Sequence, residues 1–396
     1  MGSLTQKLPG RVSFRRASTE SCGSGIVSSN SATEQGAEQI PTGIPRLRVV
    51  SDVAVRRALC CVLAVWMSLA SAVSAHDDGS QSPFAQQKIS AMDSLNCKAD
   101  ASADAQACLA GLSWSASPFE VRVEQAKSER GDALIRFPSP VDTEDKQNDL
   151  VSMEWYSARD DADRPKAAPA VVVVHESGRS MTVGRLFARG FQQRGLHAFL
   201  LHLPHYGERR GKGQSRETND VIVSIRQAVA DVRRARDAVA VLPNVDSANI
   251  SLQGTSLGGF VSATTAGLDH GYQAVFLMLA GGNLYDMLQH GQRDAAKVRE
   301  RLEKAGLTGE KLKSLIYHIE PNRLAHRYDI ERTWLYSGTK DTVVPLRNAE
   351  SLAKAAGLTK THHIHMNADH YSGIIYLPFV LNHMTRKIGE LPSAAE

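Results

Sequence analysis

The chain has 396 residues, of which 42% are hydrophobic and 22% are charged, and its formal net charge is +4. Residues 1–75 hold eight Lys/Arg and four Asp/Glu, so residues 76–396 contain 38 charged side chains of each sign. This balance gives no electrostatic basis for binding nucleic acid or an anionic membrane, and the length allows one large domain or two.

The first 75 residues contain two segments of different composition. Residues 1–45 are rich in Ser, Gly, Thr and Gln, which is typical of a disordered extension, with a start site assigned too far upstream as the alternative. Residues 46–75 place arginines before a thirteen-residue apolar run (58–70) and a small-residue stretch that ends at Ala75. This order predicts a signal peptide and an exported protein, periplasmic or secreted, without stable membrane insertion after cleavage. A buried helix or a membrane anchor is the alternative.

Only two of the five cysteines, Cys97 and Cys108, follow the signal segment. In an oxidising compartment they predict one disulfide, with two free thiols as the alternative. Residues 76–118, which include both, are interpreted as a helical or irregular N-terminal extension that packs on a main domain over 119–396. No Cys/His spacing resembles a zinc site, and neither a metal nor a cofactor is predicted.

The main domain begins with alternating apolar and polar residues and then changes character. Residues 119–124, 133–137 and 150–156 predict half-buried antiparallel strands. Residues 170–174 form a nearly continuous β-branched run, typical of a strand that is buried on both faces. The later patterns alternate, with helices over 181–194 and 220–242 and strands over 198–201, 248–253, 274–279, 332–338 and 362–366. This predicts an α/β fold with a doubly wound, mostly parallel sheet, antiparallel N-terminal strands and a ligand site at the strands' carboxyl ends.

Two further segments carry weaker signals. Between residues 282 and 328 the alternation stops, and helical patterns over 294–305 and 309–318 predict an insertion that forms a lid or wall over the pocket. The basic clusters Arg209-Arg210 and Arg233-Arg234-Arg236 are interpreted as solvated faces.

The most informative motif is the G-x-S-x-G at residues 254–258, which lies between an apolar strand pattern and a small-residue helix. A strand, a sharp turn and a helix in this order predict strained backbone geometry at the central residue, with glycines where a Cβ would collide. Ser256 is therefore the candidate nucleophile. Later strands end near Asp341 and His370, so that a serine, an acid and a histidine follow one another along the chain.

Residues 119–390 resemble the α/β-hydrolase superfamily, in its branch of dienelactone-hydrolase-like and acetyl-esterase-like serine esterases. The resemblance implies that Ser256 is the acyl-accepting nucleophile, His370 its general base and Asp341 the carboxylate that orients the imidazole. Asp341 lies in a loop (338–345) that closely resembles the acid loop of the superfamily. Two sets of residues compete for these roles: Asp286 and Asp369 for the acid, and His362, His363 and His365 for the base.

The remaining site residues follow from the same resemblance. The oxyanion hole is expected from the backbone N–H groups of Leu257 and Ser177. Glu176 stands where many lipases have glycine and resembles the Gln-Glu turn of dienelactone hydrolases, although those enzymes normally use a cysteine nucleophile. Tyr206 and Arg209 lie in a loop that also resembles this branch. Glu176, Tyr206 and Arg209 are therefore candidates for substrate binding, with local packing as the alternative for the last two.

Together these features predict an exported serine hydrolase that cleaves a carboxylic ester through an acyl-enzyme. The expected substrate is a small-molecule or carbohydrate ester, and no nucleic acid partner is expected. A serine peptidase or amidase is one alternative, and a catalytically silent binding protein on the same fold is another.

Overall fold

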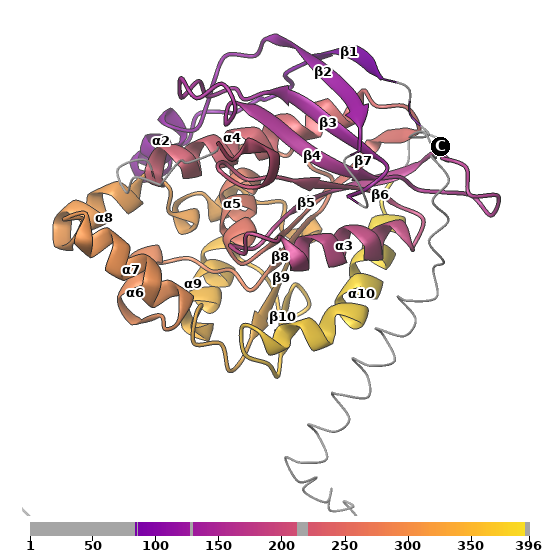
Figure 1. Cartoon of the computed structure of the whole chain (residues 1–396). Helices are drawn as coiled ribbons and strands as arrows, with labels where there is room; N and C mark the ends of the chain where they lie inside the picture. The colour runs from indigo at the N-terminus through magenta and orange to yellow at the C-terminus, as the bar shows by residue number, and fades with distance from the viewer. Residues whose placement is uncertain (1–83, 85, 127–129, 212–220, 393–396) are drawn as a thin grey trace, which may run out of the picture. The chain divides into compact units, whose positions relative to one another are not determined.

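A ten-stranded sheet runs through the part of the chain that the structure describes (Figure 1). The structure is a computed structural model that describes residues 84, 86–126, 130–211 and 221–392, all within the compact unit Gly79–Glu396. The predicted extension 1–45 and signal segment 46–75 lie outside the described residues. The strands are β1 (Gln87–Met92), β2 (Pro118–Gln125), β3 (Ala133–Pro138), β4 (Leu150–Tyr156), β5 (Ala168–Val174), β6 (His197–Leu201), β7 (Val245–Thr255), β8 (Val275–Met278), β9 (Thr333–Gly338) and β10 (His363–Met366).

The sheet is antiparallel at its N-terminal end and parallel beyond it. Its spatial order is β1-β2-β3-β4-β6-β5-β7-β8-β9-β10. Neighbours from β1 to β4 pair antiparallel, as do β4 and β6, whereas all pairs from β6 to β10 are parallel. The valines at 171–174 in the central strand β5 are fully buried, as expected for a strand covered on both faces. The predicted mixed α/β sheet is therefore confirmed.

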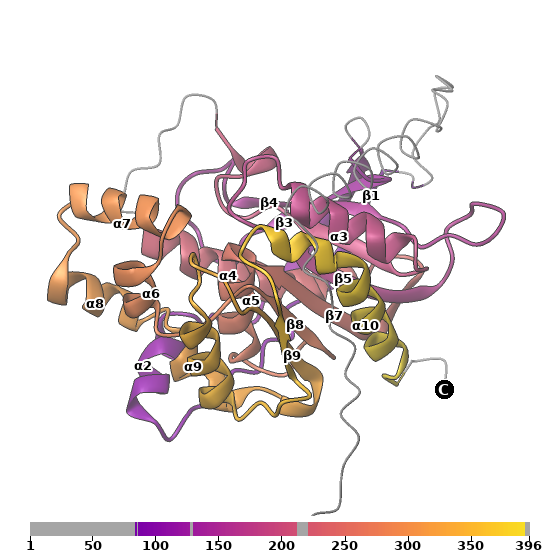
Figure 2. The same ribbon diagram turned by 90° about the horizontal axis from the view of Figure 1, so that it is seen from below.

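Helices cover both faces of the parallel part (Figure 2). Helices α3 and α10 lie on one face and contact each other, while α4, α5 and α9 lie on the opposite face. Among the described residues, no helix combines the length and the apolar character that crossing a membrane requires. The bounds are α3 (Thr182–Gln192), α4 (Val221–Ala240), α5 (Leu257–Ala266), α9 (Leu346–Ala356) and α10 (Leu377–Gly389).

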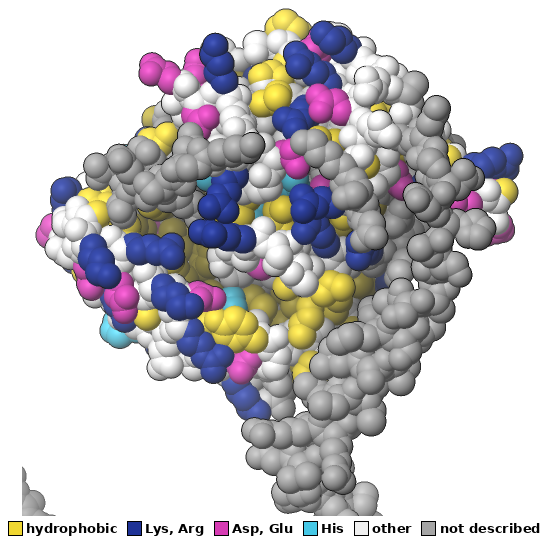
Figure 3. Space-filling model, viewed as in Figure 1, with side chains coloured by type: hydrophobic (Ala, Val, Ile, Leu, Met, Phe, Trp, Pro, Cys, Tyr) yellow, Lys and Arg dark blue, Asp and Glu magenta, His cyan; other side chains and the backbone are white. Residues whose placement is uncertain are grey.

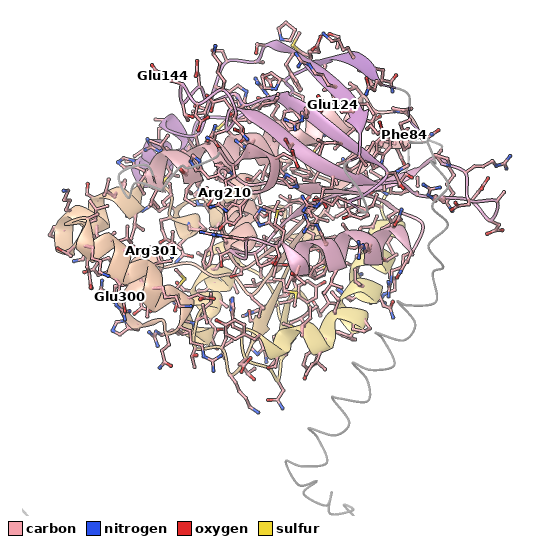
Figure 4. All side chains as sticks on the ribbon, in the orientation of Figure 1. Phe84, Glu124, Glu144, Arg210, Glu300 and Arg301 are labelled. Atoms are coloured by element: carbon pink, nitrogen blue, oxygen red, sulfur yellow. The ribbon has the colours of Figure 1, made fainter. Side chains whose placement is uncertain are left out.

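The insertion between β8 and β9 contains three helices that lie together at one end of this unit in both ribbon views. They are α6 (Leu284–His290), which the sequence pattern does not predict, α7 (Asp294–Lys304) and α8 (Gly309–Tyr317). Leucines and isoleucines from all three form a small buried cluster of their own. Glu300 and Arg301 on α7 are exposed (Figure 4). The insertion therefore has an apolar inner side and a charged outer side.

The N-terminal extension differs from its prediction because β1 is a strand. Only Ala91 of its six residues is buried, so the sequence shows no clear alternation. The strand forms by adding to the edge of β2, with Ile89 opposite Val121. Just before it, the ring of Phe84 stacks on Trp155 with centroids 3.9 Å apart (Figure 4). Backbone pairing and this contact, rather than side-chain periodicity, fix the extension to the domain.

The predicted disulfide is wrong, since Cys97 and Cys108 are both free thiols. Cys108 lies on α2 (Ala103–Ala110), where its Sγ donates a hydrogen bond to the carbonyl oxygen of Tyr317, at 3.1 Å. Burial raises the pKa of the Cys108 thiol to about 11, which makes it a poor nucleophile at neutral pH.

The prediction that the basic clusters are solvated is also wrong for Arg209, Arg233 and Arg234, which are buried. Arg233 pairs with Asp269 (Nε to Oδ1, 2.8 Å), and Arg234 pairs with Asp93 (Nη2 to Oδ2, 2.5 Å). A buried guanidinium needs such partners because removing the charge from water is costly. The partners lie 36 and 141 residues away, so local composition contains no sign of them.

Candidate active site

Ser256 lies in a sharp turn between β7 and α5. Its backbone has φ 52° and ψ −114°, a conformation that residues with a Cβ rarely adopt. The Ser256 N–H donates to the Met278 carbonyl (2.9 Å), and its own carbonyl accepts from the Phe260 N–H (3.0 Å). A Cβ on Gly258 would lie 2.1 Å from the Val174 carbonyl oxygen, so a side chain at this position would push the start of α5 away from β5. The turn is therefore held from both sides, and it presents Ser256 at the carboxyl end of the sheet.

The structure brings Ser256, His370 and Asp341 into one hydrogen-bonded chain. Ser256 Oγ lies 2.9 Å from His370 Nε2, and His370 Nδ1 lies 2.7 Å from Asp341 Oδ2. The second oxygen, Oδ1, accepts the N–H groups of Val343 (2.8 Å) and Val344 (2.9 Å). The side chain of His370 is 9% exposed and that of Asp341 is 1% exposed. This geometry favours a proton on Nδ1 and leaves Nε2 free to accept the serine proton.

The rival acids and bases all have other partners. Asp286 pairs with Arg347 (Oδ2 to Nε, 2.9 Å), and Asp369 accepts the N–H groups of the two residues that follow His370. His363 Nε2 lies 2.9 Å from Ser337 Oγ, and burial lowers its pKa to about 4. His365 packs against the ring of His363, and the ring of His362 packs against Trp334. The described contacts therefore leave Asp341 and His370 as the pair that reaches Ser256.

The two expected oxyanion donors are backbone N–H groups that follow the neighbouring strands β7 and β5. Leu257 is the first residue of α5, and Ser177 follows β5 in an exposed turn. Within the described residues, neither N–H donates a hydrogen bond. The first N–H groups of a helix have no acceptor within the helix, so the Leu257 donor is available for a negatively charged oxygen.

Glu176 stabilises the start of helix α3. Its Oε1 accepts the Val183 N–H, and its Oε2 accepts the Gly184 N–H, each at 3.1 Å. Helix α3 has no capping hydrogen bond from its own N-cap side chain, so Glu176 supplies the acceptors and a favourable negative charge. The carboxylate therefore has a local structural role, and its contact with the substrate stays a prediction.

Tyr206 and Arg209 also take roles inside the protein. The Tyr206 hydroxyl donates to the Ser177 carbonyl (3.0 Å), and its ring packs edge-on against His175. Tyr206 therefore supports the turn that carries the expected oxyanion donor. Arg209 is fully buried, pairs with Asp231 (Nη1 to Oδ2, 2.8 Å) and donates to the Asn148 carbonyl, which favours the alternative of local packing.

The insertion packs beside the loop that carries Asp341. Phe260, one helical turn after Ser256, and Met287 of α6 are partly buried and pack against both the insertion's apolar cluster and the cluster of Val343 and Val344 beside the acid. The space-filling view shows a hollow with a hydrophobic floor between the insertion and the rest of the domain, with Lys and Arg side chains around it (Figure 3). The side of the insertion next to this loop is therefore apolar.

One contact near the site is not predicted by any pattern in the sequence. Tyr371, which follows His370, donates its hydroxyl proton to Asp294 of the insertion, 77 residues away, at 2.9 Å. In the described part of the chain, no three His, Cys, Asp or Glu side chains are grouped in a way that would hold a metal ion.

No family model and no curated protein matches the chain. Among solved structures, it is similar to an acetyl xylan esterase from a Paenibacillus species, at 14% identity and a TM-score of 0.54, over 75% of this chain and 96% of that one. The chain has the α/β-hydrolase fold. Another acetyl xylan esterase, from a Thermoanaerobacterium species, matches at 13% identity over 70% of this chain and 92% of that chain, with a TM-score of 0.47. In this fold, sites form at the carboxyl ends of the strands, where Ser256, Asp341 and His370 lie.

Proposed function

We propose that the protein is a serine hydrolase that cleaves carboxylic esters through an acyl-enzyme. The observation that supports this most directly is the continuous chain of hydrogen bonds from Ser256 Oγ through His370 to Asp341. A serine hydroxyl is a weak nucleophile until a base in a fixed tautomer accepts its proton. The substrate that we propose is a small-molecule or carbohydrate ester.

The reaction has two halves that use the same groups. In the first, Ser256 Oγ attacks the ester carbonyl carbon while His370 Nε2 takes the hydroxyl proton. The negative oxygen that forms would be held by the N–H groups of Leu257 and Ser177, and each such donor contributes about 100-fold or more to the rate. When the intermediate collapses, His370 returns the proton to the departing alcohol. Water then attacks the acyl-enzyme by the same route, and the carboxylic acid is released.

An ester is favoured over an amide because an alkoxide leaves more easily than an unprotonated amide nitrogen, which must first receive a proton. The site therefore needs less from its general acid, a role that His370 takes after it has acted as the base. A peptidase would cleave the peptide amides as well as the esters. Turnover of short esters against matched peptide amides separates the two reactions.

The test uses a fluorophosphonate, which reacts with an activated serine, followed by intact-mass measurement and peptide mapping. We expect one adduct on Ser256, none in Ser256→Ala, and loss of ester turnover in the same variant. Ser247→Ala is the matched control, since Ser247 is an exposed serine at the other end of β7. A folded wild-type protein that neither forms the adduct nor hydrolyses esters would instead favour a silent binding protein.

We also propose that the protein is exported after removal of residues 1–75. The support is the order of basic, apolar and small residues over 46–75. N-terminal sequencing of protein recovered from the periplasm or the medium is expected to begin at His76. Recovery of the uncleaved chain from the cytoplasm alone would contradict export without affecting the proposed chemistry.

A further inference from the structure

The loop that carries His370 is attached to the insertion. The Tyr371 hydroxyl donates to Asp294 Oδ2 at 2.9 Å, while Asp294 Oδ1 lies 3.0 Å from Lys297 Nζ. The guanidinium of Arg293 lies over the Tyr371 ring, 5.1 Å from its centroid. The rings of His370 and Tyr371 are 5.7 Å apart and nearly perpendicular. The start of α7 therefore places a cation over the Tyr371 ring and a hydrogen-bonded carboxylate at its hydroxyl, directly next to the base.

The same segment also contacts the loop that carries the acid. The Gln292 N–H donates to the Thr342 carbonyl at 2.7 Å, and Ala295 packs with Val343 and Val344. The N–H groups of these two valines hold Asp341 Oδ1. Residues 291–295 therefore contact both loops that support the His370–Asp341 pair.

The backbone of this segment is strained at the point where it turns towards His370. Arg293 has φ 52° and ψ −109°, almost the same conformation as Ser256. A residue with a Cβ remains in this region only when its surroundings fix it, at a cost of about 1–3 kcal/mol. Arg293 is the N-cap of α7, so the strained turn aims the first turn of that helix at Tyr371.

The ionisation of the two partners is consistent with this contact. The hydrogen bond from Lys297 lowers the pKa of Asp294, and the one from Tyr371 acts in the same direction. Partial burial raises the pKa of Tyr371, and the bond to Asp294 raises it further. A neutral phenol therefore donates to an ionised carboxylate at neutral pH, and such charge-assisted bonds are stronger than neutral ones.

We propose that Tyr371 and Asp294 are positioning residues, whose hydrogen bond ties the insertion to the base loop and keeps His370 aligned between Ser256 and Asp341. This inference rests on the proposed hydrolase function. The His370 loop has its own Asx turn at Asp369, whose carboxylate also interacts with the charge of Arg293, and the side-chain hydrogen bond that joins the loop to the insertion runs through Tyr371. Loss of this bond releases the loop without removing any group that touches the substrate.

The test compares Tyr371→Phe and Asp294→Asn with the wild type in ester turnover and in the rate of fluorophosphonate labelling of Ser256. A displacement of a catalytic group by about 1 Å costs about 100-fold. We expect kcat to fall about tenfold to 100-fold with KM nearly unchanged, and labelling to slow by the same factor. Tyr285→Phe is the matched control, because Tyr285 lies on α6 of the same insertion and is expected to leave both rates unchanged.

The double variant Tyr371→Phe/Asp294→Asn distinguishes one shared bond from two separate effects. If the bond is what matters, the double variant is no slower than the slower single variant. Wild-type rates in both single variants would overturn the inference. Faster turnover in these variants would overturn it too, because it would indicate that the bond holds the insertion closed over the site. Failure of the wild type to label Ser256 would instead overturn the proposed function, so the two failures are distinguishable.

Discussion

Gly258 is the position at which the turn around Ser256 is most sensitive to one added methyl group. A Cβ there would lie 2.1 Å from the Val174 carbonyl oxygen and 2.7 Å from the His175 carbonyl oxygen, both backbone atoms at the end of β5. Ordinary contact begins at 3.4 Å, so the start of α5 would have to move by about 1.3 Å. Neither partner is a flexible side chain that can move aside, because both are backbone atoms, one at the last residue of β5 and one at the residue that follows it.

This displacement acts on both reacting groups that α5 positions, Ser256 Oγ and the Leu257 N–H. We expect Gly258→Ala to lower kcat/KM by about 100-fold, which is the usual cost of a 1 Å misplacement. Overpacking should lower the free energy of unfolding by about 1–3 kcal/mol. Ester kinetics and urea unfolding measure the two effects separately.

Gly389→Ala is the matched control for this substitution. Gly389 is the last residue of α10, and an added Cβ there meets no atom within 4 Å. We expect unchanged kinetics and equal or higher stability, since alanine favours a helix over glycine by about 0.5–1 kcal/mol. If Gly258→Ala behaved like Gly389→Ala in both assays, the close approach of α5 to β5 would not be what holds Ser256 in place.

Two further predictions concern stability. Ser256→Gly and Ser256→Ala should both be inactive. In urea unfolding, the glycine variant should be more stable than the alanine variant by about 1 kcal/mol, because only alanine keeps the backbone strain at φ 52°. Equal stability of the two variants would argue against strain. Burial lowers the pKa of His363 to about 4, so the stability it contributes is complete above its ordinary pKa of 6.5 and is lost as the pH falls towards 4. The wild type should therefore lose up to about 3 kcal/mol more than His363→Gln between pH 6.5 and 4, whereas parallel losses would refute this assignment.

The parts of the fold that the sequence predicted are those encoded by neighbouring residues. The turn at Ser256 follows from glycines whose Cβ would collide and from the strand and helix on either side. The buried strand β5 follows from its run of valines, because only a strand covered on both faces can bury every residue. The order of Ser256, Asp341 and His370 could be found for the same reason, since each follows a strand of the parallel part.

The parts that were missed depend on residues far apart in the chain. Strand β1 has one buried residue, and its partner is β2, 26 residues later in the chain. Its own residues therefore show no alternation of apolar and polar side chains that would predict a strand. The sequence predicts Arg209 and Arg234 as surface residues because their acidic partners are not in the same segment. Glu176 lies where expected, but the direction of its carboxylate, towards α3, depends on backbone geometry that spacing does not encode.

Ser256, Asp341 and His370 differ in how far along the sequence the residues that hold them in place lie. Ser256 is held by the packing of α5 against β5 and by the Met278 carbonyl, and Asp341 is held by the two valine N–H groups that follow it. His370 depends in addition on Tyr371 and on a contact with the insertion. Changes in the insertion should therefore alter the alignment of the base before they disturb the nucleophile, because a side-chain hydrogen bond joins the His370 loop to that segment.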